Sequence, residues 1–232
     1  MRLNKYLARS GMASRRKCDQ LIVEGKVFIN GQLMKNFAYH VDPEDVVVCD
    51  GVPIDTIPKM RVYLVNKLRG YLSTSSDPNG RKKVIDLINS ADRLFTVGRL
   101  DRDTTGAILV TNNGELANQL MHPRYQIEKT YIVATKKDIP RSKFSVLSKG
   151  VNLDSRTIAY GKIHRLGKKG GLIHWEVILC EGKNHEVKRI FKTLGATVIH
   201  LHRKCFAGIT ADNISPGKYR ELNKNEINEL YR

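Results

Sequence analysis

Apolar positions recur at helical spacing near the N-terminus and at strand-like spacing farther along, which predicts two different parts of the chain. In the first part, Leu3, Tyr6 and Leu7 mark one face of a short helix, and Leu21 and Ile22 mark the apolar side of a second. Three residues are suited to cap or end these helices: Ser14, Gly11 and Gly25. The first part therefore starts with two short helices.

Short β-like runs follow the two helices. Residues 27–29 and 46–49 are apolar, and each run is followed by a dipeptide that favours a tight hairpin turn, Asn30-Gly31 and Asp50-Gly51. Two helices followed by small strands predict a compact module over residues 1–58, of a size that is only marginally stable alone.

The longer part, residues 59–232, contains more strand-like than helical patterns. Strands are predicted at residues 62–65, 94–97, 107–111, 131–135, 174–179 and 197–201. Helices are predicted at residues 82–89, 115–121, 141–148 and 184–194. Because the two kinds do not alternate strictly, we expect an α+β domain with a mixed, mainly antiparallel sheet and flanking helices. Residues 56–60, which include Pro58, form the predicted linker between the two parts.

Charge separates the two parts further. The chain has 40 Lys and Arg against 23 Asp and Glu, a net charge of +17. Such a surplus attracts polyanions, of which nucleic acid is the commonest, and an anionic membrane surface is the weaker alternative. Residues 59–232 carry 32 of the basic and 16 of the acidic residues, so nearly all of the net charge belongs to the longer part. No apolar run approaches the ~20 residues that span a bilayer, and the charged N-terminus argues against a signal peptide.

Metal and cofactor sites are not indicated. Four cysteines lie far apart without a Cys-x-x-Cys pair, and we expect free thiols in a reducing cytoplasm: Cys18, Cys49, Cys180 and Cys205. His200 and His202 would share one face of a strand, but two imidazoles alone do not make a metal site. The dinucleotide fingerprint and the phosphate-loop pattern are both missing. We therefore expect no metal and no cofactor.

The first seventeen residues are basic throughout. They contain no acid and six cations: Arg2, Lys5, Arg9, Arg15, Arg16 and Lys17. Cations at the start of the second helix oppose its dipole, whereas a helix N-terminus with added Arg and Lys suits a phosphate. A merely solvated basic face is the alternative interpretation.

This segment resembles the S-four domain, a small RNA-binding module. The matching residues are Arg2 to Leu7, Ser14-Arg15-Arg16, and Glu24 to Val27 with Asn30-Gly31. The resemblance covers residues 1 to about 48 and implies structured RNA as the ligand. It implies nothing about catalysis, because such modules occur in several unrelated enzymes and binding proteins.

A charged loop is the most unusual stretch of the longer part. Residues 98–106, Gly-Arg-Leu-Asp-Arg-Asp-Thr-Thr-Gly, lie between two apolar runs, and we expect them to join two strands, where functional residues concentrate. Turn formation explains the glycines and threonines but not Arg99, Asp101, Arg102 and Asp103. From charge alone, a surface salt-bridge cluster and a functional site explain them equally well.

The same loop resembles the signature of the RsuA-type ribosomal RNA pseudouridine synthases. The match continues through residues 109–112 and 114–117, His122-Pro123, Lys129-Thr130-Tyr131 and the basic motif Glu181 to Arg189, and then Gly195, Val198, Leu201, His202, Arg203 and Gly208. The resemblance covers essentially the whole chain, including the order of the two domains. Two residues depart from the family pattern: Leu68 stands where Pro is usual, and Glu186 where Gln is usual.

The resemblance implies a site for isomerising uridine. That reaction breaks the N1–C1′ bond and forms a C5–C1′ bond without redox change, which is consistent with the missing cofactor motifs. A carboxylate can act in it as nucleophile or as base. The resemblance implies this role for Asp101, a charge partner in Lys188, and a ring beside the uracil in Tyr131 that stacks and helps to remove the C5 proton.

Further residues are implied to bind RNA. Arg99 would fill the gap that the flipped uridine leaves, and Arg189 would be a phosphate contact or a structural neighbour. Flipping costs a few kcal/mol, which phosphate contacts of the basic first module and of the longer part would offset. We expect a cytoplasmic monomer that binds structured ribosomal RNA, a precursor or an assembly intermediate, and no membrane.

The RNA target is expected to be the large ribosomal subunit. Ser75-Ser76-Asp77 and residues 80–87 resemble the branch that modifies large-subunit RNA. Small-subunit RNA is the alternative, because Lys129-Thr130-Tyr131 and Val187-Lys188-Arg189 also suit that branch.

Two other classes of function are weighed against the synthase. A non-catalytic RNA-binding or ribosome-assembly factor could lose Asp101, yet the chain retains it together with Lys188, Tyr131 and Arg99. A glycosidase-like hydrolase would use Asp101 and Asp103, but two carboxylates on one loop are poorly placed to flank a scissile bond.

Overall fold

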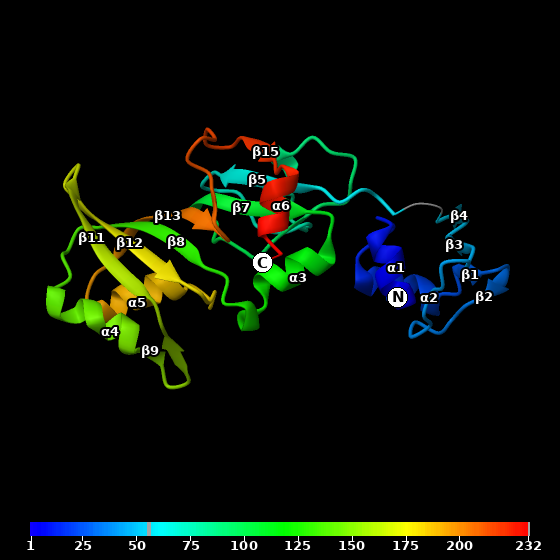
Figure 1. Ribbon diagram of the computed structural model, residues 1–232, viewed down its shortest axis with the longest axis horizontal. Coiled ribbons are helices and arrows are strands. Elements are labelled where there is room, and N and C mark those ends of the chain that lie inside the picture. The colour runs from blue at the N-terminus through cyan, green and yellow to red at the C-terminus, as the bar shows by residue number, and fades with distance from the viewer. Residues whose placement is uncertain (55–56, 232) are drawn as a thin grey trace. The chain divides into compact units, whose positions relative to one another are not determined.

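The computed structural model describes residues 1–54 and 57–231, which form two compact units (Figure 1). The first unit contains Met1–Arg61 together with Ser90–Leu94 and Asn112–Gly114. The second contains Val62–Asn89, Phe95–Thr111 and Glu115–Arg232. The predicted linker begins at Thr56, which lies outside the described residues, and the predicted domain boundary after residue 58 stays a prediction.

The two predicted helices of the first unit are present as α1 (Leu3–Arg9) and α2 (Arg15–Val23). Ser14 caps α2 as predicted, because its hydroxyl accepts a hydrogen bond from the backbone N–H of Lys17 at 3.2 Å. Leu3 and Leu7 on one helix and Cys18 and Ile22 on the other are fully buried. Their apolar faces therefore pack on one core.

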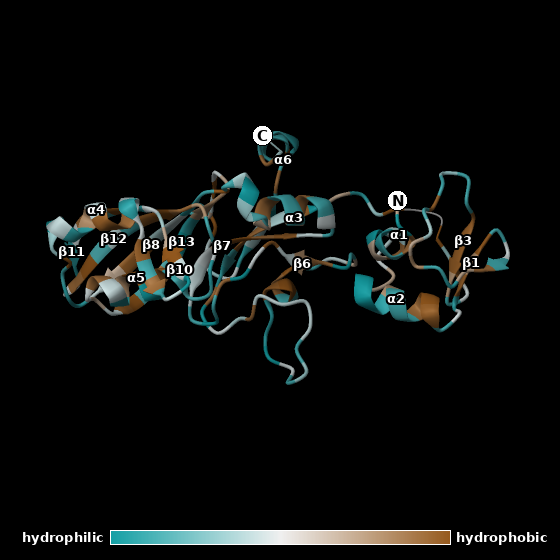
Figure 2. Cartoon of the chain, turned by 90° about the horizontal axis from the view of Figure 1, so that it is seen from below, coloured by the Kyte–Doolittle hydropathy of each residue, from teal (hydrophilic) through white to brown (hydrophobic). Residues whose placement is uncertain are grey.

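Four short strands complete that core in the order β2-β1-β3-β4. They are β1 (Val27–Ile29), β2 (Gln32–Leu33), β3 (Val47–Cys49) and β4 (Val52–Pro53), and Figure 2 shows β1 and β3 as hydrophobic. Both predicted hairpin turns are confirmed: Asn30-Gly31 and Asp50-Gly51 have positive φ at both positions, as a type I′ turn requires. Burial raises the pKa of the Cys18 thiol to about 11, so it stays protonated as a core side chain.

A nine-stranded sheet forms the second unit. Seven strands follow the order β11-β12-β8-β13-β7-β5-β15, with β14 paired to β13 and β6 paired to β7. The strands are β5 (Val62–Lys67), β6 (Phe95–Thr96), β7 (Thr105–Thr111), β8 (Lys129–Thr135), β11 (Lys162–Lys169), β12 (Leu172–Leu179), β13 (Val198–Phe206), β14 (Ile209–Thr210) and β15 (Tyr219–Glu221). The β13–β7 pair is parallel and the other pairs are antiparallel, which confirms the predicted mixed, mainly antiparallel sheet.

Helices and a small hairpin accompany this sheet. The helices are α3 (Gly114–Met121), α4 (Phe144–Lys149), α5 (Glu186–Leu194) and α6 (Lys224–Glu229), with 3₁₀ turns η1 (Val84–Leu87), η2 (Pro123–Tyr125) and η3 (Arg141–Lys143). The strands β9 (Val151–Asp154) and β10 (Thr157–Ala159) pair with each other. Trp175 of β12 is fully buried in edge-to-face contact with Phe144 of α4 and Phe191 of α5, so both helices pack on the same face of the sheet.

Some predicted elements differ from the structure. The helix expected at residues 82–89 is only the single turn η1, because Ile88 returns to extended backbone. The helix expected at 141–148 begins as the 3₁₀ turn η3 and continues as α4. Strands β9, β10, β11, β14 and β15 and helix α6 were not predicted. In β11 only Ile163 is buried, so this edge strand has no apolar alternation that a sequence pattern could reveal.

Candidate active site

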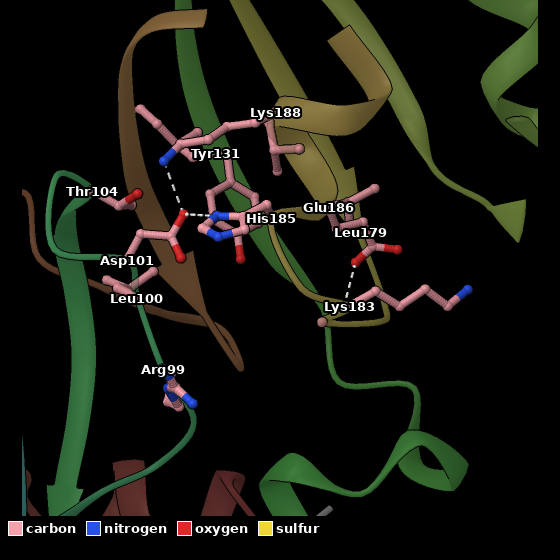
Figure 3. Close-up of a pocket in the computed structure, with 13 residues that line it drawn as sticks. Arg99, Leu100, Asp101, Thr104, Tyr131, Leu179, Lys183, His185, Glu186 and Lys188 are labelled. Atoms are coloured by element: carbon pink, nitrogen blue, oxygen red, sulfur yellow. Dashed lines mark hydrogen bonds and ion pairs between the residues drawn. The ribbon is translucent and has the colours of Figure 1, made fainter. Parts of the chain in front are cut away.

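The charged loop, α5 and β8 meet at one pocket (Figure 3). The loop joins β6 to β7, as expected, and brings Asp101 to the pocket. Lys188 comes from the first turn of α5 and Tyr131 from β8. These side chains, 87 positions apart at most, line the same pocket. A neighbouring cavity of about 790 Å³ shares Asp101 and Tyr131 with it, a size suited to a small ligand or one nucleotide.

Asp101 and Lys188 form the ion pair that the resemblance implied. The Lys188 ammonium donates to Oδ2 of Asp101 at 2.9 Å and also to both oxygens of Asp103, at 2.8 and 3.0 Å. Burial opposes the charge of Lys188, but the hydrogen bonds to Asp103 and Asp101 outweigh it and raise the pKa of Lys188. The hydrogen bond from Lys188 lowers the pKa of Asp103. The ammonium therefore stays charged between two carboxylates.

His185 is a second partner of Asp101, and it was not predicted as a site residue. Its Nδ1 lies 2.8 Å from Oδ2 of Asp101, the same oxygen that Lys188 contacts. The residue precedes α5 in a left-handed backbone conformation, with φ 49° and ψ 31°. His185 belongs to the basic motif of the sequence, but nothing in that motif indicates which side chain it contacts.

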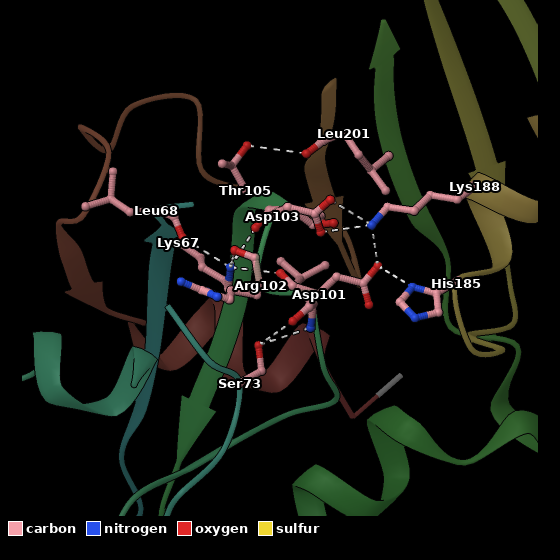
Figure 4. A network of polar contacts seen from close by, with 12 residues as sticks. Lys67, Leu68, Ser73, Asp101, Arg102, Asp103, Thr105, His185, Lys188 and Leu201 are labelled. Atoms are coloured by element: carbon pink, nitrogen blue, oxygen red, sulfur yellow. Dashed lines mark hydrogen bonds and ion pairs between the residues drawn. The ribbon is translucent and has the colours of Figure 1, made fainter. Parts of the chain in front are cut away.

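Lys67 is hydrogen-bonded to the backbone of the loop (Figure 4). Its side chain is fully buried, and its Nζ donates to the backbone carbonyls of Thr104 at 2.7 Å, Asp101 at 3.0 Å, Leu68 at 3.1 Å and Arg102 at 3.4 Å. Burial lowers the pKa of Lys67 to about 8. A charged residue at the end of an apolar strand is the one sequence signal that could have indicated this role.

The start of β7 is fixed against β13. A side chain at Gly106 would place its Cβ 2.2 Å from the carbonyl oxygen of Arg203, so only glycine allows the two strands to approach this closely. Arg203 is itself buried, donates from Nε to the carbonyl of Ala107 at 2.7 Å, and interacts with the side chain of Tyr131. Its guanidinium lies 4.7 Å from the ring centre of Phe206. Tyr131 is thus supported by a buried cation that the sequence did not reveal as part of the site.

The described residues contain no group of three or more His, Cys, Asp and Glu side chains arranged to hold a metal ion. None of the helices in the described part of the chain has both the length and the apolar character that a membrane crossing requires.

Comparison with known proteins agrees with this geometry. The sequence pattern of the RNA pseudouridylate synthases matches residues 61–193, and that of the S4 domain matches residues 1–47. The chain belongs to the RNA pseudouridine synthase family. The resemblance noted in the sequence is therefore confirmed for both parts of the chain.

Relatives align with this synthase over its whole length. It is 40% identical to an uncharacterized RNA pseudouridine synthase of Mycobacterium leprae, over 100% of this chain and 93% of the relative. It is 36% identical to an uncharacterized RNA pseudouridine synthase of Aquifex aeolicus, over 100% of this chain and 94% of the relative. A crystal structure of a pseudouridylate synthase superposes with a TM-score of 0.72 at 26% identity, covering 99% of both chains. This likeness extends to both domains and their order.

Two residues depart from the family pattern: Glu186 is the first residue of α5, and Leu68 directly follows β5. Glu186 is buried; one of its oxygens accepts from the backbone N–H of Lys183 at 3.0 Å, and the other has no partner among the described residues. Burial raises the pKa of Glu186. Leu68 contacts the turn at Gly217, where an added Cβ would lie 2.7 Å from the leucine side chain. Burial therefore disfavours the charged form of Glu186, whereas Leu68 packs on a turn.

The predicted RNA-binding residues fall into three groups. Arg99 is exposed and lines the pocket with Asp101. Arg189 forms an ion pair with Asp154, which fits a structural neighbour of the site. The basic residues of the first module all lie in the first unit, with Arg15, Arg16 and Lys17 exposed in the first turn of α2: Arg2, Lys5, Arg9, Arg15, Arg16 and Lys17.

Proposed function

We propose that this synthase converts a specific uridine of large-subunit ribosomal RNA to pseudouridine. Two relatives are named ribosomal large subunit pseudouridine synthase B. The Bacillus subtilis protein is 37% identical over 99% of this chain and 95% of its own length. The Pseudomonas aeruginosa protein is 34% identical over 99% of this chain and 61% of its own length. These names favour large-subunit RNA over the small-subunit alternative.

Asp101 is the catalytic residue of this proposal. In the reaction the N1–C1′ bond of the uridine breaks, the base turns, and C5 bonds to C1′. The proton on C5 leaves to a base and N1 gains a proton, so substrate and product have the same atoms. The carboxylate of Asp101 serves as the nucleophile or the base, with its charge stabilised by Lys188. Tyr131 lies beside the uracil ring and helps to remove the C5 proton.

RNA is held by charge and the uridine reaches the pocket by flipping. Arg99, exposed at the pocket, fills the place that the flipped nucleotide leaves in the RNA. Arg15, Arg16 and Lys17 contact phosphates at the N-terminus of α2. These contacts supply binding energy that offsets the cost of unstacking the base.

The observation that carries the proposal is the ion pair of Asp101 with Lys188 in the pocket that Tyr131 lines. Its test uses ribosomal RNA with tritium on C5 of uridine, because pseudouridine formation releases that tritium to water. Asp101→Asn removes the carboxylate charge and nearly preserves its shape. We expect no tritium release above background, with RNA affinity within about threefold of wild type. Normal release by this variant would contradict the role of Asp101.

The RNA target is tested in cells. Pseudouridines are mapped in both ribosomal RNAs from cells with and without this protein. The loss of one large-subunit position is expected, whereas the loss of a small-subunit position would assign the alternative target. We also propose that the protein is a monomer and acts in the cytoplasm on a precursor or assembly intermediate. Light scattering tests the monomer, and a comparison of activity on free RNA and on mature subunits tests the substrate.

A further inference from the structure

Two donors from one short segment hold the same oxygen of Asp101. Nδ1 of His185 lies 2.8 Å and Nζ of Lys188 lies 2.9 Å from Oδ2. Positions three apart at the start of a helix lie on the same side, so both side chains can reach the loop together (Figures 3 and 4). No hydrogen bond from a described residue reaches Oδ1 of Asp101. The carboxylate is thus held at one oxygen and open at the other.

The two donors differ in how they orient the carboxylate. The Lys188 ammonium is a compact charge with rotatable donors, and it is shared with both oxygens of Asp103. An imidazole N–H instead points along one direction fixed by the ring. Because an ionised carboxylate can only accept, Nδ1 of His185 carries the hydrogen in this contact. Lys188 therefore supplies charge, and His185 supplies direction.

His185, which contacts Asp101, has a left-handed backbone conformation. The left-handed conformation is unfavourable for a residue other than glycine, because its Cβ comes close to the following carbonyl oxygen. Such conformations cluster at functional sites, where the surrounding structure enforces them. Here the segment is fixed on both sides, because the N–H of Glu186 donates to the carbonyl of Lys183 at 3.2 Å and that of Arg189 donates to the carbonyl of His185 at 2.9 Å.

We propose that His185 is a positioning residue of this synthase. With Lys188 it fixes the rotation of the Asp101 carboxylate through Oδ2 and leaves Oδ1 as the oxygen that meets the flipped uridine. The proposal rests on the proposed function of Asp101. It assigns His185 no bond to the substrate, so its loss affects the rate of the reaction step more than the binding of RNA.

Two substitutions separate the hydrogen bond from the backbone strain. Glycine adopts the left-handed conformation freely, and asparagine is among the side chains most often found there. Asparagine can still donate a hydrogen bond toward Asp101, whereas glycine cannot. We expect His185→Gly to lower kcat about 10- to 100-fold with KM within about threefold, the size of loss that misplacing a catalytic group causes. We expect His185→Asn to retain kcat within about threefold.

The measurement is tritium release from C5-labelled ribosomal RNA at saturating and subsaturating RNA, with thermal melting of each variant to verify folding. Wild-type kcat in His185→Gly would overturn the proposal. An equal loss of kcat in His185→Gly and His185→Asn would also overturn it, because the hydrogen bond would then not account for the effect. Asp101→Asn is measured beside them: if that variant remains active, the proposed function itself fails, whereas an inactive Asp101→Asn with an unimpaired His185→Gly refutes the role of His185 alone.

Discussion

Replacing Lys67 by methionine tests whether a buried ammonium shapes the charged loop at residues 98–106. Its Nζ donates to the carbonyls of four residues, three of them in the loop, among them Asp101 itself. Methionine fills similar space but donates no hydrogen bond. The substitution therefore removes the contacts that hold the loop backbone and changes none of the residues that line the pocket.

Two opposing contributions determine the stability of Lys67→Met. Losing the two shortest hydrogen bonds, to Thr104 and Asp101, costs about 1.5–3 kcal/mol each for a charged donor. Removing a buried ammonium works in the other direction, since its pKa is lowered from 10.5 to about 8, which corresponds to about 3 kcal/mol. The free energy of unfolding should therefore fall by no more than about 3 kcal/mol.

The rate is expected to fall even under conditions in which the variant stays folded. A displacement of about 1 Å at a catalytic group can lower the rate about 100-fold, so we expect kcat of Lys67→Met to fall by about that factor. The assay is tritium release at a temperature well below the melting transition of the variant. Lys143→Met is the matched control, because Lys143 also donates to a carbonyl, that of Leu194 at 3.2 Å, but outside the loop. If Lys67→Met kept a wild-type kcat, the ammonium would not be what shapes the loop.

Two further predictions concern charge. Burial raises the pKa of Glu186, so with rising pH the unfolded chain loses this proton first, and the free energy of unfolding falls across that window. Glu186→Gln should lack this fall. At pH 8 it should melt about 2–8 °C higher, as for a gain of about 1–2 kcal/mol, and an unchanged melting temperature would contradict the cost assigned to burying the charged form. Replacing Arg15, Arg16 and Lys17 together by Gln should reduce the slope of log affinity for RNA against log salt by about 2, whereas the same change at the exposed Lys149, Lys218 and Lys224 should leave it nearly unchanged. Equal slopes in the two triple variants would count against a phosphate site on α2.

Local sequence signals predicted the first unit well. The Ser14 cap and the hairpins at Asn30-Gly31 and Asp50-Gly51 are determined by residues close in sequence, and each is present. Edge strand β11 was not predicted, because apolar and polar residues alternate along a strand only where one of its faces is buried, and β11 is mostly exposed. The helix expected at residues 82–89 was wrong, because only Val84–Leu87 form a helical turn before Ile88 becomes extended. One turn is too short to continue as an α-helix.

The residues of the candidate site also fall into those that the sequence indicated and those that it did not. The family signature indicated Asp101, Lys188 and Tyr131, and the structure brings these three to one pocket. It could not indicate Lys67 or His185 as partners of the loop, because their contacts join segments 34 to 84 positions apart and depend on how β5 and α5 pack against it. A motif can indicate which single residues carry the chemistry, whereas tertiary packing determines which groups orient those residues.

The chain contains a single tryptophan, and its position makes it an optical probe of one unit only. Trp175 lies in the second unit, donates from its indole nitrogen to Thr135 at 2.9 Å, and touches Phe191 of α5. Its emission will therefore follow the loosening of the helix that carries His185 and Lys188. Circular dichroism sums over both units, so a difference between the fluorescence and dichroism transitions would reveal that the units melt separately.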